Sequence, residues 1–156
     1  MKSSITFQFL AEPTDVNFGG NVHGGMVMKW IDQAAYACAA QWSGKYCVTV
    51  SANAIRFIKP IKVGQIVNLQ AQLVHTGTSS MHIYVVVQSC SPTTNEMKVT
   101  NRCFITFMAT DGAGKPVAVP SYIPEDDLQL QLELVAMNAK DFAKQLDTDF
   151  RDTLGC

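Results

Sequence analysis

The stretch 26–42 is compatible with a helix throughout and is too apolar to lie exposed to solvent. At 100° per residue, one stripe of this helix is wholly apolar and consists of Val27, Ile31, Ala34 and Cys38. About seventeen residues of helix extend roughly 25 Å at 1.5 Å per residue. An apolar surface of that length must be buried against another layer, so the rest of the chain is expected to wrap around this helix.

Five segments with the alternation typical of β-strands surround the helix in the sequence. One precedes it and four follow, and they span residues 3–10, 46–58, 66–75, 81–90 and 99–110. Short turns join the last four, so these strands are expected to pair antiparallel. A single sheet with one covered face leaves its edges open, which predicts dimerisation by edge pairing.

The strand expected over residues 46–58 changes its pattern part-way. Val48, Val50 and Ala52 are expected to share one face, with Thr49 on the other. Beyond Ala54 the apolar residues switch parity, which predicts a β-bulge near this residue.

A second helix is expected over residues 124–146, because proline and acids occupy its first turn. Its apolar stripe fits either core packing or a subunit contact, and consists of Leu128, Leu132, Val135, Ala139, Phe142 and Leu146. The final residues, 147–156, are expected to fray.

Composition narrows the class of protein. With 47% apolar and 16% charged residues, the 156-residue chain is globular, and we expect one domain with a main unit over 1–123 and a C-terminal helix and tail over 124–156. A net charge of -1 gives no reason to expect a nucleic-acid partner, and no apolar run reaches the ~18 residues of a membrane helix.

Five cysteines without a close pair predict neither a disulfide framework nor a zinc site, and indicate a reducing, cytoplasmic setting. The N-terminus is too short and too polar for a signal peptide.

A glycine-rich turn leads into the first helix. It contains Gly19, Gly20, Gly24 and Gly25, and glycine lets another group approach the backbone closely. The N-terminus of a helix presents unpaired N–H groups and a partial positive charge. Turn and helix together are therefore a candidate cradle for a carbonyl oxygen or an oxyanion.

The helix carries a single acid, Asp32, on the edge of its apolar stripe. Only Lys29 among its helical neighbours could pair with it. Asp32 is therefore either a surface residue paired with Lys29, an interface residue or a catalytic residue.

The ordered motifs resemble those of hotdog-fold acyl-CoA thioesterases, closest to the YciA-like branch and the cytosolic acyl-CoA hydrolases. The resemblance covers about residues 3–120 and rests on DVNxxGxxHGG followed by Asp32, on VTV at 48–50, on FIKPIKVG at 57–64, on GTSS at 77–80 and on FMATD through GKP at 107–116. His23 departs from the branch, in which phenylalanine is common at this position.

The resemblance implies an α+β hotdog fold, in which a long central helix is wrapped by an antiparallel sheet of five or six strands, with a C-terminal helix in addition. It implies dimers with two sites at the interface, assembled into trimers of dimers. In the family the acid matching Asp32 is catalytic, and the residue matching Asn17 faces it from the partner chain. The backbone N–H of Gly24 or Gly25 would polarise the thioester carbonyl.

The implied reaction is hydrolysis of acyl-CoA to a carboxylic acid and coenzyme A, without a metal or other cofactor. Asp32 could activate water as a general base or attack the thioester directly. His23 could donate to the carbonyl oxygen or simply cap the turn, and Asn17 could hold water or form an Asx turn.

Coenzyme A also brings phosphates to the protein. Arg56, Lys59 and Lys62 are candidate partners for them, although an ordinary solvated strand end fits equally. A second set could contact pantetheine or pyrophosphate, or could be a plain hairpin turn, and consists of Gly77, Thr78, Ser79 and Ser80.

Two rival functions use the same fold. An acyl-thioester hydratase or dehydratase needs a histidine–acid pair, for which His23 and Asp32 would have to serve. A non-catalytic acyl-CoA sensor would bind the ligand and regulate a partner. A serine hydrolase is not expected, because the sequence contains no GxSxG motif.

Overall fold

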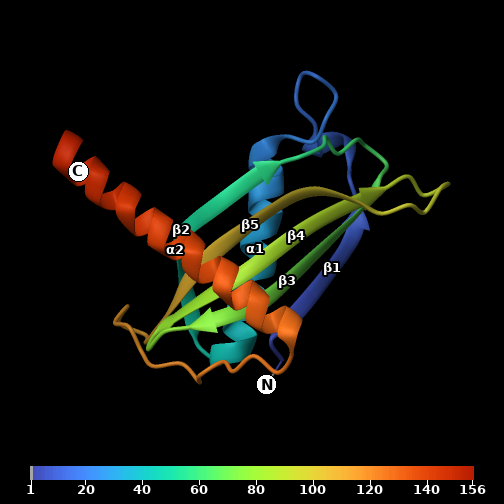
Figure 1. Ribbon diagram of the computed structural model, residues 1–156. Helices are drawn as coiled ribbons and strands as arrows, with labels where there is room; N and C mark the ends of the chain where they lie inside the picture. Colours follow the sequence, from blue (N-terminus) through green and yellow to red (C-terminus); the bar gives the residue numbers. More distant parts are fainter. Residues whose placement is uncertain (1) are drawn as a thin grey trace.

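The computed structural model describes residues 2–156 and contains one five-stranded antiparallel sheet with a long helix on each face (Figure 1). The strand order is β1-β3-β4-β5-β2. The strands are β1 (Ser4–Leu10), β2 (Tyr46–Phe57), β3 (Ile66–Thr76), β4 (Ser80–Cys90) and β5 (Lys98–Thr110). Helix α1 (Gly24–Ser43) follows a short 3-10 turn η1 (Pro13–Asp15), and helix α2 (Asp127–Leu154) ends the chain. The expected central helix wrapped by an antiparallel sheet is confirmed.

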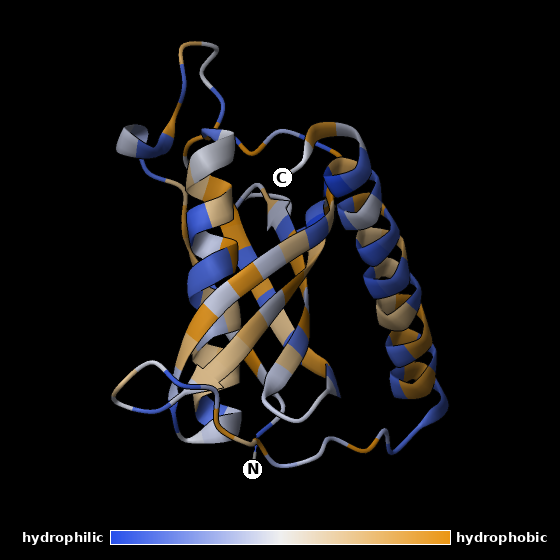
Figure 2. Cartoon of the chain, turned by 90° about the vertical axis from the view of Figure 1, so that its left-hand side faces the viewer, coloured by the Kyte–Doolittle hydropathy of each residue, from blue (hydrophilic) through white to orange (hydrophobic). Residues whose placement is uncertain are grey.

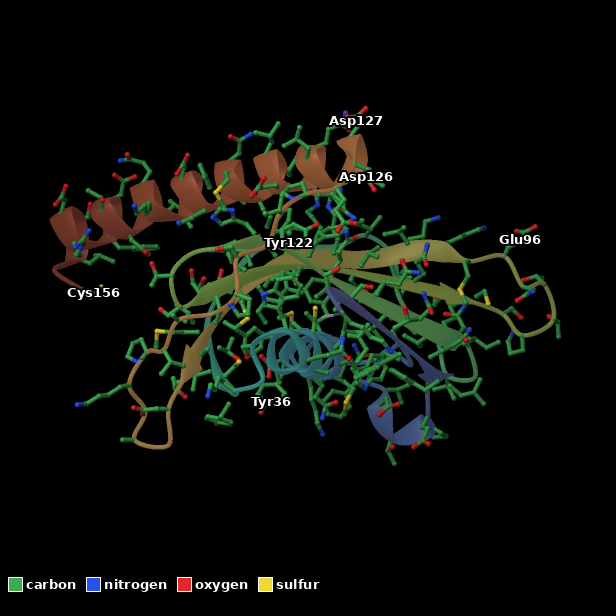
Figure 3. All side chains as sticks on the ribbon, turned by 90° about the horizontal axis from the view of Figure 1, so that it is seen from below. Tyr36, Glu96, Tyr122, Asp126, Asp127 and Cys156 are labelled. Atoms are coloured by element: carbon green, nitrogen blue, oxygen red, sulfur yellow. The ribbon has the colours of Figure 1, made fainter. Side chains whose placement is uncertain are left out.

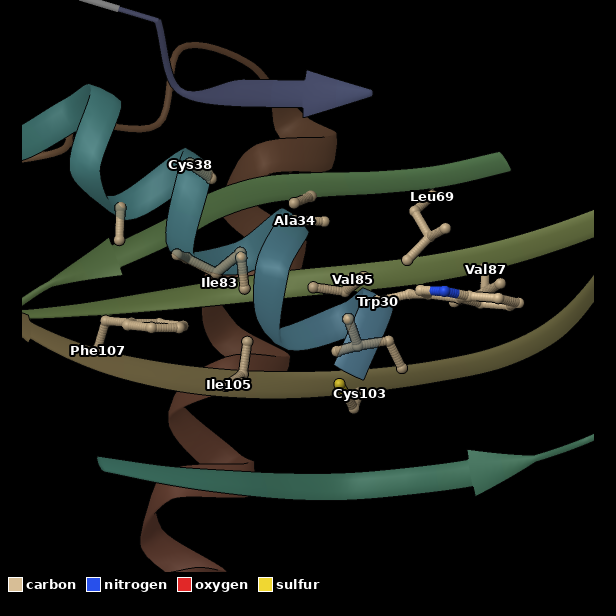
Figure 4. Packing of buried hydrophobic residues seen from close by; sticks show 14 of the residues in the cluster. Trp30, Ala34, Cys38, Leu69, Ile83, Val85, Val87, Cys103, Ile105 and Phe107 are labelled. Carbon is tan, nitrogen blue, oxygen red and sulfur yellow. The ribbon is translucent and has the colours of Figure 1, made fainter. Parts of the chain in front are cut away.

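The apolar stripe of α1 packs on the inner face of the sheet. Val27, Ile31, Ala34 and Cys38 are all buried, as expected from their spacing. The inward rows of three strands meet them (Figure 4), with Leu69 from β3, Val85 from β4 and a row from β5 that includes Cys103, Ile105 and Phe107. Each fully buried aliphatic side chain contributes about 1.5–3 kcal/mol, so this layer dominates the stability of the fold.

Strand β2 has two irregularities rather than the one expected. Its pairing with β5 shifts between Thr49 and Ser51, and again between Asn53 and Arg56. The second shift includes Ala54, which has φ 53, and confirms the expected bulge. The first shift makes the expected face assignment wrong. Thr49 lies opposite the inward-facing Phe107, and therefore faces α1.

Helix α2 begins later and ends later than expected. Asp126 caps it by accepting a hydrogen bond from the Gln129 N–H at 2.8 Å, so residues 124–126 precede the helix. The expectation of a frayed end was wrong, because the helix continues to Leu154 and Gly155 closes it at φ 72. Left-handed glycine is a common helix stop, and Gly155 donates its N–H to the Arg151 carbonyl.

Helix α2 is longer than the sheet it crosses. Its 28 residues extend ~42 Å, whereas five strands spaced ~4.8 Å apart span ~19 Å. Figures 2 and 3 show α1 and α2 on opposite sides of the sheet, and in Figure 3 the end of α2 at Cys156 extends beyond the sheet. Ala136 is buried against the sheet, but Leu128, Val135, Phe142 and Leu146 of the expected stripe are exposed.

Neither helix is long and apolar enough to cross a membrane within the described part of the chain. All five cysteines are free, and four of them are buried. Burial raises the pKa of Cys38 to about 11 and that of Cys103 to about 12, which keeps both thiols protonated.

Candidate active site

Asp32 lies half-buried in the third turn of α1, facing strand β2. The Thr49 hydroxyl donates a hydrogen bond to its Oδ1 at 2.7 Å. Across residues 2–156 the single ion pair within 4.0 Å joins His75 and Glu133, so Asp32 is not paired with Lys29. The surface-pair interpretation therefore loses its support. A carboxylate with one oxygen fixed by a hydroxyl is oriented without being neutralised.

His23 is the N-cap of α1, and its Nδ1 accepts a hydrogen bond from the Gly25 N–H at 2.8 Å. A Cβ atom at Gly25 would lie 3.0 Å from that nitrogen, so glycine lets the ring close over the helix end. Because Nδ1 accepts, the proton of the neutral ring lies on Nε2. The structure thus shows the capping role for His23.

Gly24 is the glycine whose N–H remains available. Gly25 donates to His23, whereas the Gly24 N–H has no acceptor among the described residues. Gly24 also lines a hollow of about 270 Å³ beside the start of α1, together with Asn17, Val27, Phe57 and Asn101. A free N–H at a helix N-terminus that opens into a hollow is suited to binding a carbonyl oxygen.

Asn17 organises the loop before α1. Its Oδ1 accepts hydrogen bonds from the N–H groups of Gly19 at 2.9 Å and Asn21 at 3.3 Å. This is the Asx-type turn considered from the sequence. The Asn17 side chain is also exposed at the edge of the hollow, where its amide nitrogen remains free to contact a ligand.

Gly24 and Asp32 are too far apart in one chain to act on one carbonyl. They are eight positions apart on the same helix, which separates their backbones by ~12 Å. The Asp32 side chain points back toward the N-terminus and shortens the gap by only a few ångströms. A reacting carbon must lie within ~3–3.5 Å of its nucleophile. The two groups could serve one substrate if each came from a different copy of the chain.

The candidate cations near the hollow are exposed, but they do not all face it. Lys59 lines the hollow and Lys62 lies beyond it on the surface. Arg56 is directly opposite Arg102 in the β2–β5 register, on the other face of the sheet from Asn101. Like charges placed opposite each other repel, so this arginine pair would be stabilised by an anion.

The turn of Gly77, Thr78, Ser79 and Ser80 lies at the other end of α1. Trp42 near the end of α1 donates to the Pro120 carbonyl, and the neighbouring Val119 N–H donates to the Thr78 carbonyl. Within one chain this turn is therefore not brought together with Gly24 or Lys59. No group of three or more His, Cys, Asp or Glu side chains is placed to bind a metal within residues 2–156.

Comparison with known proteins places this arrangement in a family. A model described as the thioesterase superfamily matches residues 19–94. The uncharacterised acyl-CoA thioester hydrolase YkhA of Bacillus subtilis is 35% identical over 125 residues, covering 80% of this chain and 73% of YkhA. The chain belongs to the thioesterase superfamily.

Solved structures of this superfamily match almost the whole chain. An acyl-CoA hydrolase from Staphylococcus aureus, in complex with butyryl coenzyme A, coenzyme A and coenzyme A disulfide, has a TM-score of 0.88 and 30% identity, covering 97% of this chain and 93% of that one. A hexameric acyl-CoA thioesterase without ligand has a TM-score of 0.88 and 31% identity, covering 97% and 94%.

Further structures of the Staphylococcus aureus enzyme are of alanine variants. An asparagine, an aspartate and a threonine are each replaced in turn. In that chain the aspartate follows the asparagine by 15 positions, and the threonine follows the aspartate by 17.

Two residues of this candidate site were not assigned to it from the sequence. Thr49 was placed on the wrong face because the first irregularity of β2 has no glycine or proline to mark it. Asn101 was passed over, although it interrupts the apolar inward row of β5. For Asn101 the available signal was a polar residue in an apolar inward row, and for Thr49 it was the VTV segment at 48–50 of the resemblance.

Proposed function

We propose that this chain is an acyl-CoA thioesterase, which hydrolyses acyl-CoA to a carboxylic acid and coenzyme A. The observation that carries the proposal is the half-buried Asp32 carboxylate, oriented by the Thr49 hydroxyl at 2.7 Å. Family membership supports the reaction class. Asn17, Asp32 and Thr49 have the separations of 15 and 17 positions found among the three residues replaced in the Staphylococcus aureus enzyme.

In this proposal Gly24 binds the thioester oxygen, and Asp32 acts on the attacking water or on the carbonyl carbon. The Gly24 N–H donates to the thioester oxygen and stabilises the negative charge that develops there, which is worth on the order of 3–4 kcal/mol. Asp32 either takes a proton from the attacking water or attacks the carbonyl carbon itself, forming an anhydride that water then hydrolyses. In both routes the C–S bond breaks, coenzyme A leaves as the thiol and the acyl group leaves as the acid. Thr49 keeps the reacting carboxylate oxygen aimed.

The active unit in this proposal is a dimer. Because Gly24 and Asp32 are ~12 Å apart along one helix, each site takes the N–H from one copy and the carboxylate from the other. The open edge at β2 exposes Tyr46 at 64% and Val50 at 57%, and offers a strand for pairing with a second copy. We further propose a hexamer built from three such dimers, in line with the hexameric neighbour.

Coenzyme A would then extend from the hollow toward the exposed cations. Lys59 at the rim and the Arg56–Arg102 pair are the candidates for its phosphates, with Lys62 beyond them. Gly77, Thr78, Ser79 and Ser80 could contribute to the same site from the second copy, because they lie at the opposite end of α1.

The hydratase alternative is weakened by the position of His23. Its Nδ1 is committed to the Gly25 N–H, and it lies nine positions before Asp32, so the two do not form a histidine–acid pair in one chain. An assay for free coenzyme A thiol distinguishes the sensor alternative from the enzyme, because a sensor binds acyl-CoA without releasing thiol.

Replacing Asp32 tests the function. We expect Asp32→Ala and Asp32→Asn to lower kcat by at least 10²-fold, since a general base contributes about 10²–10⁴-fold. The matched control is Asp141→Ala, which removes an exposed helical acid from α2. Release of free coenzyme A thiol from butyryl-CoA is the measurement, with thermal unfolding to show that each variant is folded. Turnover of Asp32→Ala close to that of the wild-type protein would remove Asp32 from the reaction.

A further inference from the structure

Asn101 is a buried polar residue for which the fold provides no partner. It lies on the inward face of β5, opposite Phe57 on one side and Val87 on the other, and is 2% exposed. Its Oδ1 is buried and has no hydrogen-bond partner among the described residues. The positions that continue its row, Cys103 and Ile105, are apolar and equally buried. An unpaired buried acceptor is destabilising, so a polar side chain here needs a reason.

The position of Asn101 supplies that reason. It lines the same hollow of about 270 Å³ as Gly24, whose N–H is free. Gly24 is half-exposed and Phe57 is 55% exposed, so both lie at the mouth, whereas Asn101 forms the floor. Val22, Val27 and Ile61 supply apolar walls. The hollow therefore combines donors at its mouth, among them the Gly24 N–H, with apolar sides and the buried amide of Asn101 at its floor.

The shape of the hollow decides which part of a thioester reaches the floor. With the carbonyl oxygen on Gly24, the pantetheine arm must lead back out to solvent, because it continues to the nucleotide. The free end of the acyl group is the part that can point inward. A liquid water occupies about 30 Å³, so a hollow of about 270 Å³ accommodates a short acyl group of several heavy atoms.

We infer that Asn101 determines acyl specificity, and that the hollow takes short acyl groups that carry a hydroxyl. The inference rests on the proposed thioesterase function and names its substrate class. The terminal torsion of an asparagine side chain is soft, so either its oxygen or its nitrogen can turn toward a ligand. A hydroxyl suits both cases because it donates to the oxygen and accepts from the nitrogen. An unsubstituted alkyl group would leave the Asn101 amide unpaired. Enzymes discriminate most strongly against substrates that leave a buried polar group of the site without a partner.

The test compares three substrates on three proteins. The substrates are butyryl-CoA, 2-hydroxybutyryl-CoA and 3-hydroxybutyryl-CoA, and the proteins are wild type, Asn101→Leu and Asn68→Leu. Asn68 is the matched control, because it makes the same chemical change on the outer side of β3, where its amide contacts Gln88. We expect the wild type to favour one hydroxyacyl substrate by about 10-fold or more in kcat/KM. Asn101→Leu should remove that preference, and Asn68→Leu should keep it.

A second measurement separates specificity from structure. Asn101→Leu removes an unpaired polar group from an apolar layer, so its thermal unfolding midpoint should rise above that of the wild type. If Asn101 instead holds a structural water, the variant would be less stable and its substrate ratio unchanged. That result, or a wild type without preference for either hydroxyacyl substrate, would overturn the inference.

If none of the three substrates is hydrolysed, the proposed thioesterase function is wrong, but the role of Asn101 can still be tested by binding. Dissociation constants of the three acyl-CoAs, measured by calorimetry on Asp32→Asn with and without Asn101→Leu, report the same preference without turnover. Equal affinities in both proteins would reject the role of Asn101 independently of catalysis.

Discussion

At the scale of single residues, the site depends on groups that hold other groups in place. Thr49 orients Asp32, and His23 closes the first turn of α1 so that Gly24 rather than Gly25 keeps a free N–H. Neither residue has to react with a substrate. Each role depends on one short hydrogen bond, and replacing one side chain removes that bond, so both roles can be tested by single substitutions.

Replacing Thr49 with valine should lower kcat by about 10- to 100-fold, because a hydrogen bond to a charged group contributes about 1.5–3 kcal/mol. Thr49→Ser keeps the hydroxyl and should retain most of the activity. Steady-state kinetics on butyryl-CoA is the measurement. A loss in Thr49→Ser with full activity in Thr49→Val would mean that the methyl group, and not the hydroxyl, is what matters.

Variants of His23 separate the cap from a catalytic imidazole. Asparagine is a good N-cap, so His23→Asn should keep the free energy of unfolding near that of the wild type, whereas His23→Phe should lower it by about 1 kcal/mol. Turnover by His23→Asn should stay close to that of the wild type. A folded His23→Asn protein with turnover reduced 100-fold would instead assign the ring a chemical role. Denaturant titration and thiol release provide the two measurements.

At the scale of elements, the layer between α2 and the sheet is polar where the layer under α1 is apolar. His82 on β4 is 8% exposed there, and its Nδ1 contacts the Thr106 hydroxyl at 2.9 Å while its Nε2 has no partner among residues 2–156. Next to it, His75 pairs with Glu133 of α2 at 2.7 Å. Burial, followed by the charges of Lys140 and His75, lowers the pKa of His82 to about 4.

This shift predicts that acid weakens the packing of α2. The unfolded chain binds a proton at His82 near pH 6.5, whereas the folded protein resists it until about pH 4. The contribution of neutral His82 is therefore fully present above pH 6.5 and is lost as the pH falls toward 4, by at most about 3 kcal/mol. Denaturant titrations of wild type and His82→Phe at pH 7.5, 5.5 and 4.5 measure it. Parallel pH dependence in the two proteins would contradict the assignment to His82.

At the scale of the whole molecule, one chain holds the parts of the candidate site too far apart to act on one substrate. Under the proposed function, the ~12 Å between Gly24 and Asp32 along α1, and the far position of the turn 77–80, require a second copy. Helix α2 extends beyond the sheet and exposes Phe150 at 50% and Leu154 at 66%, so its end is also available for contacts between copies.

Complementation between two inactive variants tests the shared site. In a dimer of Asn17→Ala with Asp32→Ala, one of the two sites receives Asn17 from one copy and Asp32 from the other. Mixed dimers isolated through both tags should therefore recover about half of the wild-type activity. Co-expression with two different tags, followed by tandem purification and thiol release, is the measurement. Mixed dimers as inactive as either parent would place both residues in the same chain's site.

Local patterns in the sequence predicted most of the elements of this protein. The apolar stripe of α1, the strand segments and the bulge at Ala54 follow from side-chain periodicity and backbone preference, and the structure confirms them. The two ends of α2 could not be predicted from local patterns. Pro124 and Asp126 are both good helix starts, and the stop at Gly155 lies beyond a polar segment that gave no sign of continuing as a helix. The functional assignments to Asp32, Asn17, Gly24 and the cations remain predictions.

The sequence by itself determined which segments are helical or extended and which faces are apolar, because those properties depend on neighbours a few positions away. Only the tertiary structure decided that Thr49 faces Asp32, that His23 takes the Gly25 N–H, and that Asn101 lies without a partner at the floor of the hollow beside Gly24. These contacts depend on the register between strands and on how the end of a helix is closed. A shift of one residue in register moves a side chain to the opposite face of the sheet, and no local pattern in β2 marked the first of its two shifts, between Thr49 and Ser51.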